Sequence, residues 1–221
     1  MLRVVIIGAG GHAREVLDIL LACQTNRHEI EPLGFIDENL DNHGHTLDGF
    51  PVLGDFHWFE GVDHGEIEVI CAVGTPKVCR RLTQRAWSLG LRFASAISPR
   101  ASISPHARIG QGVMIFANVI VNTGAVIGDH VILNVAVTVS HDTVVGDFCN
   151  INPGVHLAGN VTVGEGCYIG MGANVIQGVA IGPWSIIGAG AVVVRDVPAN
   201  VTAVGVPAKV IKTREEGWHE R

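Results

Sequence analysis

Apolar residues recur at every sixth position through almost half of the chain. From Ile97 to Val193 each sixth residue is Ile, Leu or Val without interruption, and a small or β-branched residue follows each of them four positions later. Neither an α-helix with 3.6 residues per turn nor an alternating strand has this period. A hexapeptide repeat is typical of a parallel β-helix, in which both kinds of residue face inward.

The repeat also predicts how successive coils stack. Three hexads, or 18 residues, make one triangular coil, and neighbouring coils should lie about 4.8 Å apart. Cys149 and Cys167 share the small inward position at this spacing, which predicts two stacked, buried thiols. Glycines directly after the aliphatic residue, such as Gly146, are expected to bend the chain at positive φ. His106 and His130 occupy outward positions and are expected at the surface or in subunit contacts.

The N-terminal third has a different pattern, in which apolar runs are followed by glycines. The run Arg3–Ile7 predicts a strand buried on both faces, and Gly8–Ala13, a G-x-G-x-x-A sequence, leads from it into an apolar-periodic helix. At such a turn, backbone N–H groups and the helix N-terminus can hold a phosphate. Leu33–Asp37 predicts a second strand that ends in an acid suited to a ribose or base. Val69–Gly74 predicts a later strand, followed by a helix at 76–89.

The glycine motif by itself also fits a tight turn without a ligand. The acid after the second predicted strand and the glycine after the later one favour nucleotide binding. The segment supplies one mononucleotide-binding half, so a nucleotide or nucleotide-sugar fits better than a dinucleotide. We therefore expect an α/β, Rossmann-like nucleotide-sugar-binding half domain at residues 1–95, a parallel β-helix domain at 96–200 and a C-terminal tail at 201–221.

Composition and charge exclude several classes of protein. The chain has 221 residues, a net charge of −6 and 16% charged residues, which leaves no basic excess for nucleic acid or for a polybasic membrane patch. No apolar run approaches the ~20 residues of a membrane span, and the first residues predict a strand rather than a signal peptide. Five cysteines without a C-x-x-C pair favour a reducing compartment, so we expect a cytoplasmic protein.

One outward position of the β-helix carries a candidate acid–base pair. His141 and Asp142 are adjacent, and a carboxylate beside an imidazole fixes its tautomer and raises its basicity. Gly159 follows His141 by one coil, which leaves a slot for an acyl chain and a backbone N–H for an oxyanion. An ordinary solvated histidine is the alternative at position 141, and His156 is a weaker candidate for a ligand contact. No closely spaced histidine pair predicts a metal site, which disfavours a zinc hydratase.

Three sequence features together resemble a known family. They are Gly8-Ala9-Gly10-Gly11-His12, His141-Asp142 followed by Val145-Gly146-Asp147-Phe148, and Val204-Gly205-Val206-Pro207-Ala208-Lys209. On these motifs the whole chain resembles the PglD/NeuD-like sugar acyltransferases of bacterial glycan biosynthesis, including that of lipopolysaccharide O-antigen. The resemblance implies a left-handed β-helix, acetyl-CoA as co-substrate without a metal, and a homotrimer with active sites between neighbouring β-helices.

The resemblance also implies roles for individual residues. His141 would be the general base and Asp142 the acid that orients it. The acetyl-CoA channel, near the tail at 201–221, would be lined largely through backbone groups by Asn150, Gly159, Met171 and Ala189. The nucleotide-sugar would be held by Gly10, Gly11, His12, Asp37 and Gly74, with Asn134 near the amino-sugar ring. Asn150 departs from the family, in which a second histidine is common at this position. Asparagine cannot become charged, so it could contact the cofactor but could not relay a proton.

The leading hypothesis is an acetyl-CoA-dependent N-acetyltransferase that acts by direct attack of the 4-amino group of a nucleotide-linked 4-amino-4,6-dideoxy sugar. O-acetylation of a free sugar such as sialic acid is the nearest alternative. A non-catalytic, nucleotide-binding trimeric scaffold is another. The missing second mononucleotide half disfavours an NAD-dependent dehydrogenase. The nucleotide, UDP, GDP or dTDP, and the configuration of the sugar stay open at this level.

Overall fold

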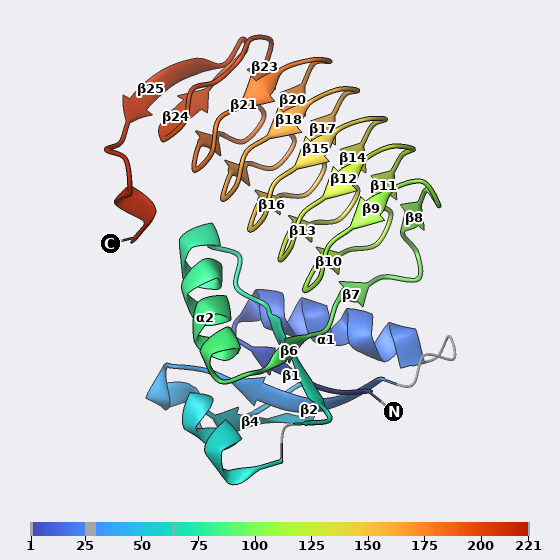
Figure 1. The fold of residues 1–221 in the computed structure, drawn as a ribbon, viewed down its shortest axis with the longest axis vertical. Coiled ribbons are helices and arrows are strands. Elements are labelled where there is room, and N and C mark those ends of the chain that lie inside the picture. Colours follow the sequence, from blue (N-terminus) through green and yellow to red (C-terminus); the bar gives the residue numbers. More distant parts are fainter. Residues whose placement is uncertain (1, 25–29, 64, 221) are drawn as a thin grey trace. The chain divides into compact units, whose positions relative to one another are not determined.

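A computed structural model describes residues 2–24, 30–63 and 65–220 (Figure 1). The described chain divides into two compact units. The first contains residues up to 74 together with 78–99, and the second contains 75–77 together with the residues from 100 onward. Within the described ranges, no helix combines the length and the apolar composition that crossing a membrane requires.

The first unit is built around a mostly parallel sheet in the order β3-β4-β2-β1-β5-β6 (Figure 1). Its strands are β1 (Leu2–Ile7), β2 (Ile30–Ile36), β3 (Thr46–Leu47), β4 (Phe50–Gly54), β5 (Ile67–Cys71) and β6 (Arg92–Phe93). The helices are α1 (Gly11–Gln24) and α2 (Pro76–Ser88), with 3-10 turns η1 (Leu40–Asn42) and η2 (Phe56–Gly61), and β7 (Ala96–Ile97) ends the unit. Strands β1, β2 and β5 and helices α1 and α2 match the elements that the apolar runs predict, whereas the short strands and the 3-10 turns were not predicted.

Burial explains why these segments adopt this topology. Val4–Ile7 are buried throughout, as expected for a central strand, and α1 buries Ala13, Val16, Leu17 and Leu20, one stripe of a helix. Strand β1 pairs in parallel with β2 on one side and with β5 on the other. The strand order therefore reverses beside β1, and the carboxyl ends of the strands at such a reversal form the usual ligand crevice of α/β sheets.

The second unit is the predicted left-handed parallel β-helix, built from stacked two-residue strands (Figure 1). One face contains β10 (Met114–Ile115), β13 (Ile132–Leu133), β16 (Asn150–Ile151), β19 (Tyr168–Ile169), β22 (Ile186–Ile187), β24 (Val201–Val204) and β25 (Lys209–Thr213). The second contains β8 (Ser102–Ile103), β11 (Ile120–Val121), β14 (Thr138–Val139), β17 (His156–Leu157), β20 (Asn174–Val175) and β23 (Val192–Val193). The third contains β9 (Arg108–Ile109), β12 (Val126–Ile127), β15 (Val144–Val145), β18 (Thr162–Val163) and β21 (Ala180–Ile181).

The interior of the β-helix follows the hexad pattern. Strand partners are 18 residues apart, as in the pairs Ile120 with Thr138 and Thr138 with His156. From Val113 onward, every predicted inward position up to Val197 is buried. The first coil is only half-buried at its inward positions, because a terminal coil has a neighbouring coil on one side alone. Cys149 and Cys167 are fully buried, which confirms that they are interior thiols.

The predicted role of the glycines directly after the aliphatic residue is wrong. Gly146 and its equivalents do not have positive φ; the left-handed residue comes two positions later, as at Phe148 (φ 57°) or Asp142 (φ 58°). Glycine is needed at position 146 for space, since a β-carbon there would lie 2.8 Å from the backbone nitrogen of Glu165 in the next coil. The pattern therefore located glycines that the fold requires, but they are required for space against the next coil and not for positive φ.

His130 is also not the surface residue that its outward position predicts. Its side chain is 1% exposed and stacks on Phe148 of the next coil, with ring centroids 5.2 Å apart and planes 13° from parallel. Gly112 lies against the other side of the imidazole. Burial lowers the pKa of His130 to about 4, against the opposing effect of Asp129 and Asp147. His106, by contrast, is exposed as predicted.

The C-terminal segment covers the last coil. Strand β24 pairs in parallel with β22, and β25 returns antiparallel to β24. The chain then forms η3 (Trp218–Glu220), where His219 stacks on Trp184 with ring centroids 3.8 Å apart. Arg214 donates to Thr202 Oγ1 at 2.7 Å and lies over the ring of Trp218. These contacts fix the tail to the β-helix.

Candidate active site and nucleotide pocket

The candidate acid–base pair lies on one edge of the β-helix. His141 and Asp142 follow β14 at the corner between two faces, and both side chains are more than half exposed. The imidazole Nδ1 lies 3.0 Å from Asp142 Oδ2. This contact assigns the proton to Nδ1, which leaves Nε2 as the acceptor that a general base needs.

Two glycines in the flanking coils make room for this pair. A β-carbon on Gly159, one coil further along, would lie 2.5 Å from both Nε2 and Cε1 of His141. A β-carbon on Gly124, one coil earlier, would collide with the Asp142 carboxylate. The imidazole therefore lies directly over bare backbone, which is the arrangement that the 18-residue spacing predicts.

Two further candidate polar residues, His156 and Asn134, lie on other parts of the β-helix. His156 on β17 is exposed, and its Nδ1 lies 2.8 Å from the hydroxyl of Thr138 on β14. Asn134, which follows β13, is half-buried, and its side-chain oxygen accepts from the N–H of Val135 at 2.7 Å. These hydrogen bonds are made with Thr138 and Val135 and not with His141, so both residues stay separate candidates for a ligand contact.

The predicted acetyl-CoA residues do not converge within one chain. Gly159 lies with His141 at the edge that follows β14 and β17, whereas Met171 and Ala189 follow β19 and β22 at a different edge. Met171 is 61% exposed and Ala189 is also exposed. Asn150 belongs to β16, and only 6% of its surface is exposed. Among the described residues, no group of three or more His, Cys, Asp or Glu could hold a metal ion.

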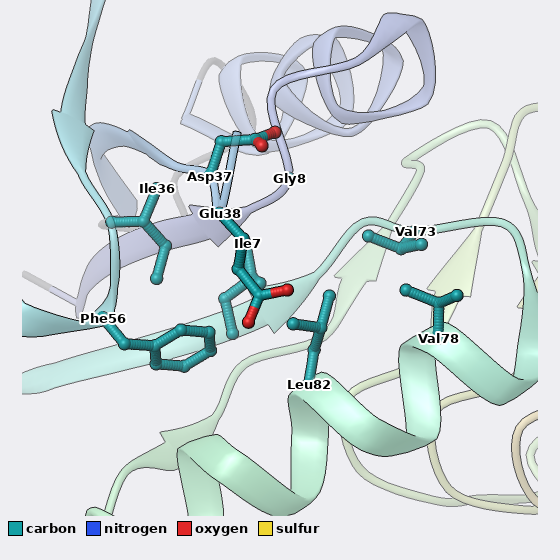
Figure 2. Close-up of a pocket in the computed structure, with 9 residues that line it drawn as sticks. All are labelled: Ile7, Gly8, Ile36, Asp37, Glu38, Phe56, Val73, Val78 and Leu82. Atoms are coloured by element: carbon teal, nitrogen blue, oxygen red, sulfur yellow. The ribbon is translucent and has the colours of Figure 1, made fainter. Parts of the chain in front are cut away.

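A separate cavity of about 160 Å³ lies in the first unit, at the carboxyl ends of its central strands (Figure 2). Its walls are formed by the ends of β1 and β2, the residue Val73 after β5, and side chains from η2 and α2. Gly8 (φ 107°) turns the chain out of β1, and its N–H donates to Ile36 O at 2.7 Å. The predicted nucleotide cradle and this cavity therefore share Gly8 and the end of β2.

Among the predicted nucleotide-binding residues, Asp37 lines this cavity, whereas Gly10, Gly11 and His12 lie where α1 begins. Gly10 and Gly11 are exposed, and a β-carbon at either would meet open space, so the start of α1 is accessible. The His12 imidazole contacts Glu15 at 3.4 Å, and burial lowers its pKa. Asp37 accepts the N–H groups of Ala9 and Asn39, which ties the glycine loop to the end of β2. Gly74 follows Val73 at the cavity wall.

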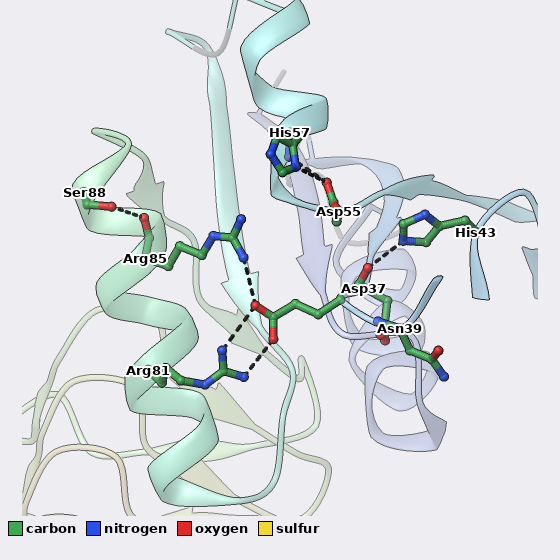
Figure 3. A network of polar contacts seen from close by, with 9 residues as sticks. Asp37, Asn39, His43, Asp55, His57, Arg81, Arg85 and Ser88 are labelled. Carbon is green, nitrogen blue, oxygen red and sulfur yellow. Dashed lines mark hydrogen bonds and ion pairs between the residues drawn. The ribbon is translucent and has the colours of Figure 1, made fainter. Parts of the chain in front are cut away.

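Sequence analysis missed the polar group that points into this cavity. Figure 2 shows the Glu38 carboxylate directed between Phe56 and Leu82, whereas that of Asp37 points away toward Gly8. Arg81 and Arg85 of α2 hold the Glu38 carboxylate in place (Figure 3). The i, i+4 spacing of the two arginines on the predicted helix was a usable signal, but their partner could not be identified without the fold.

Comparisons with known proteins match family models to both parts of the chain. The family model of the PglD N-terminal domain matches residues 3–86, and that of the bacterial transferase hexapeptide (six repeats) matches 142–177 and 162–195. The first model covers the cavity-bearing unit, and the second begins at Asp142. No curated protein matched the chain by sequence.

Several solved structures are similar over nearly the whole chain. The H141N mutant of perosamine N-acetyltransferase from Caulobacter crescentus, in complex with CoA and GDP-perosamine, is 38% identical with a TM-score of 0.88, covering 95% of this chain and 96% of its own. The acetyltransferase domain of PglB from Neisseria gonorrhoeae is 38% identical with a TM-score of 0.87, covering 96% and 100%. WeeI from Acinetobacter baumannii is 29% identical with a TM-score of 0.86, covering 96% and 100%. The chain belongs to the PglD/NeuD-like sugar acyltransferases of the left-handed β-helix superfamily.

Proposed function

We propose that this protein transfers the acetyl group of acetyl-CoA to the 4-amino group of a nucleotide-linked 4-amino-4,6-dideoxy sugar. The observation that carries the proposal is the exposed His141–Asp142 pair, 3.0 Å apart, over the bare backbone of Gly159. The CoA and GDP-perosamine complex of the Caulobacter crescentus relative supports both the co-substrate and the class of acceptor.

In the proposed reaction the sugar amine attacks the thioester carbonyl carbon. His141 Nε2 takes a proton from the amine as the C–N bond forms, and Asp142 holds the imidazole through Nδ1–H. The C–S bond then breaks, and the proton passes to the departing thiolate. The backbone N–H of Gly159 is the assigned donor to the oxyanion that forms on the carbonyl oxygen. His141 has no adjacent Ser or Cys nucleophile, so the mechanism uses no acyl-enzyme.

The proposed enzyme is a homotrimer with each acetyl-CoA site between two β-helices. Met171 and Ala189 lie on a different edge of the β-helix from His141 and Gly159. A second copy that faces the His141 edge with its Met171 edge would bring these groups to one channel. The exposure of Met171 supports this arrangement, because a large apolar side chain at a corner gains by burial against a partner. A monomer in analytical ultracentrifugation would contradict it.

The nucleotide end of the substrate is assigned to the first unit. Open backbone at Gly10 and Gly11 before α1 suits the phosphates, because the helix N-terminus presents unpaired N–H groups to anions. His12 in the first turn of α1, Asp37 after β2 and Gly74 after β5 complete the proposed binding surface. Asn134 is assigned to the sugar and Asn150 to the acetyl-CoA channel, as the family resemblance implies.

The test is thiol release from acetyl-CoA, followed with Ellman's reagent, against UDP-, GDP- and dTDP-linked 4-amino sugars and free sialic acid. Release with a nucleotide-linked amino sugar is the expected result. Release with free sialic acid alone would favour O-acetylation instead. No release with any acceptor, together with no binding of CoA, would favour the nucleotide-binding scaffold.

A further inference from the structure

The cavity beside Glu38 has the size and lining of a subsite for one ring system. Its volume of about 160 Å³ is below the roughly 300–1,000 Å³ of pockets that enclose a whole drug-sized ligand. Six of its lining side chains are apolar: Ile7, Ile36, Phe56, Val73, Val78 and Leu82. Such walls suit the two faces of a flat aromatic ring and leave recognition to its edge (Figure 2).

The polar group at this edge is a carboxylate with a fixed orientation. Arg81 donates from Nη1 to Glu38 Oε1 at 3.2 Å and from Nη2 to Oε2 at 2.7 Å. Arg85 donates from Nη1 to Oε1 at 2.9 Å (Figure 3). The Cζ atom of Arg85 also lies 4.5 Å from the ring centroid of Phe56. Hydrogen bonding from Arg81 lowers the pKa of Glu38, so the group is an ionised acceptor at neutral pH.

The acceptor capacity of Glu38 is not exhausted by the two arginines. An ionised carboxylate has about four acceptor positions, and the three contacts above occupy both of those on Oε1 but one of those on Oε2. Oε2 therefore keeps a position for a donor on the edge of a ring held between Phe56 and Leu82. Arg85, which uses one of its N–H groups on Glu38, remains a donor for a neighbouring carbonyl oxygen.

The nucleobases differ in what they offer to such an acceptor. Guanine presents two adjacent donors, N1–H and the N2 amino group, next to the acceptor O6. Uracil and thymine present one N–H between two carbonyl oxygens, which a carboxylate repels. Adenine and cytosine present an amino group beside a ring nitrogen that is itself an acceptor. A carboxylate next to an arginine thus complements guanine and opposes the others.

We infer that Glu38 selects guanine as the base of the nucleotide, by accepting a hydrogen bond from its N2 amino group at the remaining position on Oε2. The inference rests on the proposed function, since it names the nucleotide of that same substrate. It assigns Glu38 as a specificity-determining residue, Phe56 and Leu82 as the walls against the ring, and Arg81 as the residue that positions the carboxylate.

The test is equilibrium binding of GDP, IDP, UDP and dTDP to the full chain without acetyl-CoA, by isothermal titration calorimetry. IDP lacks the N2 amino group and retains N1–H. The wild type should bind GDP roughly 10-fold more tightly than IDP, and UDP and dTDP more weakly still. In Glu38→Gln the affinity for GDP should fall roughly 10- to 100-fold, and GDP and IDP should then bind within about twofold of each other. Because that ratio is measured within one variant, a general loss of stability does not affect it.

Glu31→Gln is the matched control. Glu31 is a partly exposed carboxylate near the amino end of β2 that pairs loosely with Arg3 at 3.9 Å, and it should leave every affinity unchanged. Tighter binding of UDP or dTDP than of GDP, an unchanged GDP-to-IDP ratio in Glu38→Gln, or no nucleotide binding would overturn the inference. Acetyl transfer to a UDP- or dTDP-linked amino sugar would overturn the choice of guanine while the proposed function stands. Glu38-dependent GDP binding without acetyl transfer would uphold the base selection and contradict the function.

Discussion

The imidazole of His141 lies over the α-carbon of Gly159 in the next coil, at a distance that leaves no room for a β-carbon. The register of the β-helix, rather than a local loop, thus sets the position of the candidate base. The missing side chain at Gly159 on one coil makes room for the candidate base on another.

Gly159→Ala should displace the imidazole and lower kcat. The added β-carbon would lie 2.5 Å from Nε2, so the ring must move, and a shift of about 1 Å at a catalytic group can cost roughly 10²-fold. Steady-state kinetics with circular dichroism would measure this. Gly61→Ala is the control, because a β-carbon there meets open space. Normal turnover by Gly159→Ala would show that the slot is not required.

His141→Asn should reduce kcat by about 10²–10⁴-fold with little change in substrate affinity, since it removes the base and not a binding wall. His106→Asn, at an exposed position of the first coil, should behave as the wild type. Nearly normal turnover of His141→Asn would exclude this residue as the base.

Asp142→Asn should lose less activity than His141→Asn, because Asp142 orients the imidazole through Nδ1 and does not itself carry the transferred proton. The kcat values of the two variants, measured under the same conditions, test this order. A larger loss in Asp142→Asn would reverse the assigned roles.

His130→Phe should make folding less sensitive to acid. The pKa of His130 is lowered to about 4 in the fold, so between pH 6.5 and 4 the unfolded chain binds a proton that the folded chain does not. Stability is therefore lost as the pH falls through this window, by about 2 kcal/mol at pH 5. Phe148 occupies the equivalent position with φ 57°, so phenylalanine suits this backbone.

Urea unfolding of the wild type and His130→Phe at pH 7.5 and pH 5, at equal protein concentration, measures this difference. His106→Gln, which replaces an exposed histidine, should keep the pH dependence of the wild type. Parallel pH dependences for all three proteins would show that His130 accepts a proton in the fold as readily as in the unfolded chain.

The five cysteines should not react with Ellman's reagent in the native protein. All are buried, and burial raises the pKa of the Cys149 thiol well above its ordinary value, which suppresses the reactive thiolate. Denaturant should expose all five. A native titration with no fast phase would also mean that the acetyl-transfer assay has no protein background; a fast phase of one thiol or more would contradict the burial.

The sequence alone predicted the β-helix because its period is set by packing inside the chain. Ile, Leu or Val at each inward position packs only against the neighbouring coils, so the repeat can be recognised in the sequence without knowing any other contact. The same logic predicted that Gly159 lies beside His141 and Asp142, because the two positions are related by one coil. It failed at His130, whose burial depends on the side chain stacked above it rather than on its own hexad.

The candidate nucleotide pocket could be predicted only in part. Gly8 and Asp37 stand out because strand-to-helix glycines and strand-ending acids have a local pattern. Glu38 does not, because its significance comes from Arg81 and Arg85 on a helix more than forty residues later in the chain. The apolar walls of the cavity and the arginines that bind Glu38 come from segments far apart in the sequence, so no short motif predicts them.

Each coil of the β-helix contains three hexads, one for each face, and this limits how the chain can change in length. Removing six residues would leave every aliphatic and small residue facing inward, so the interior would tolerate the loss. Every side chain beyond the deletion would nevertheless move to the next edge of the triangle, and a six-residue deletion between residues 141 and 159 would separate the His141 imidazole from Gly159. Core packing therefore permits changes of six residues, whereas keeping the residues of each edge in register requires changes of eighteen residues, which is one whole coil.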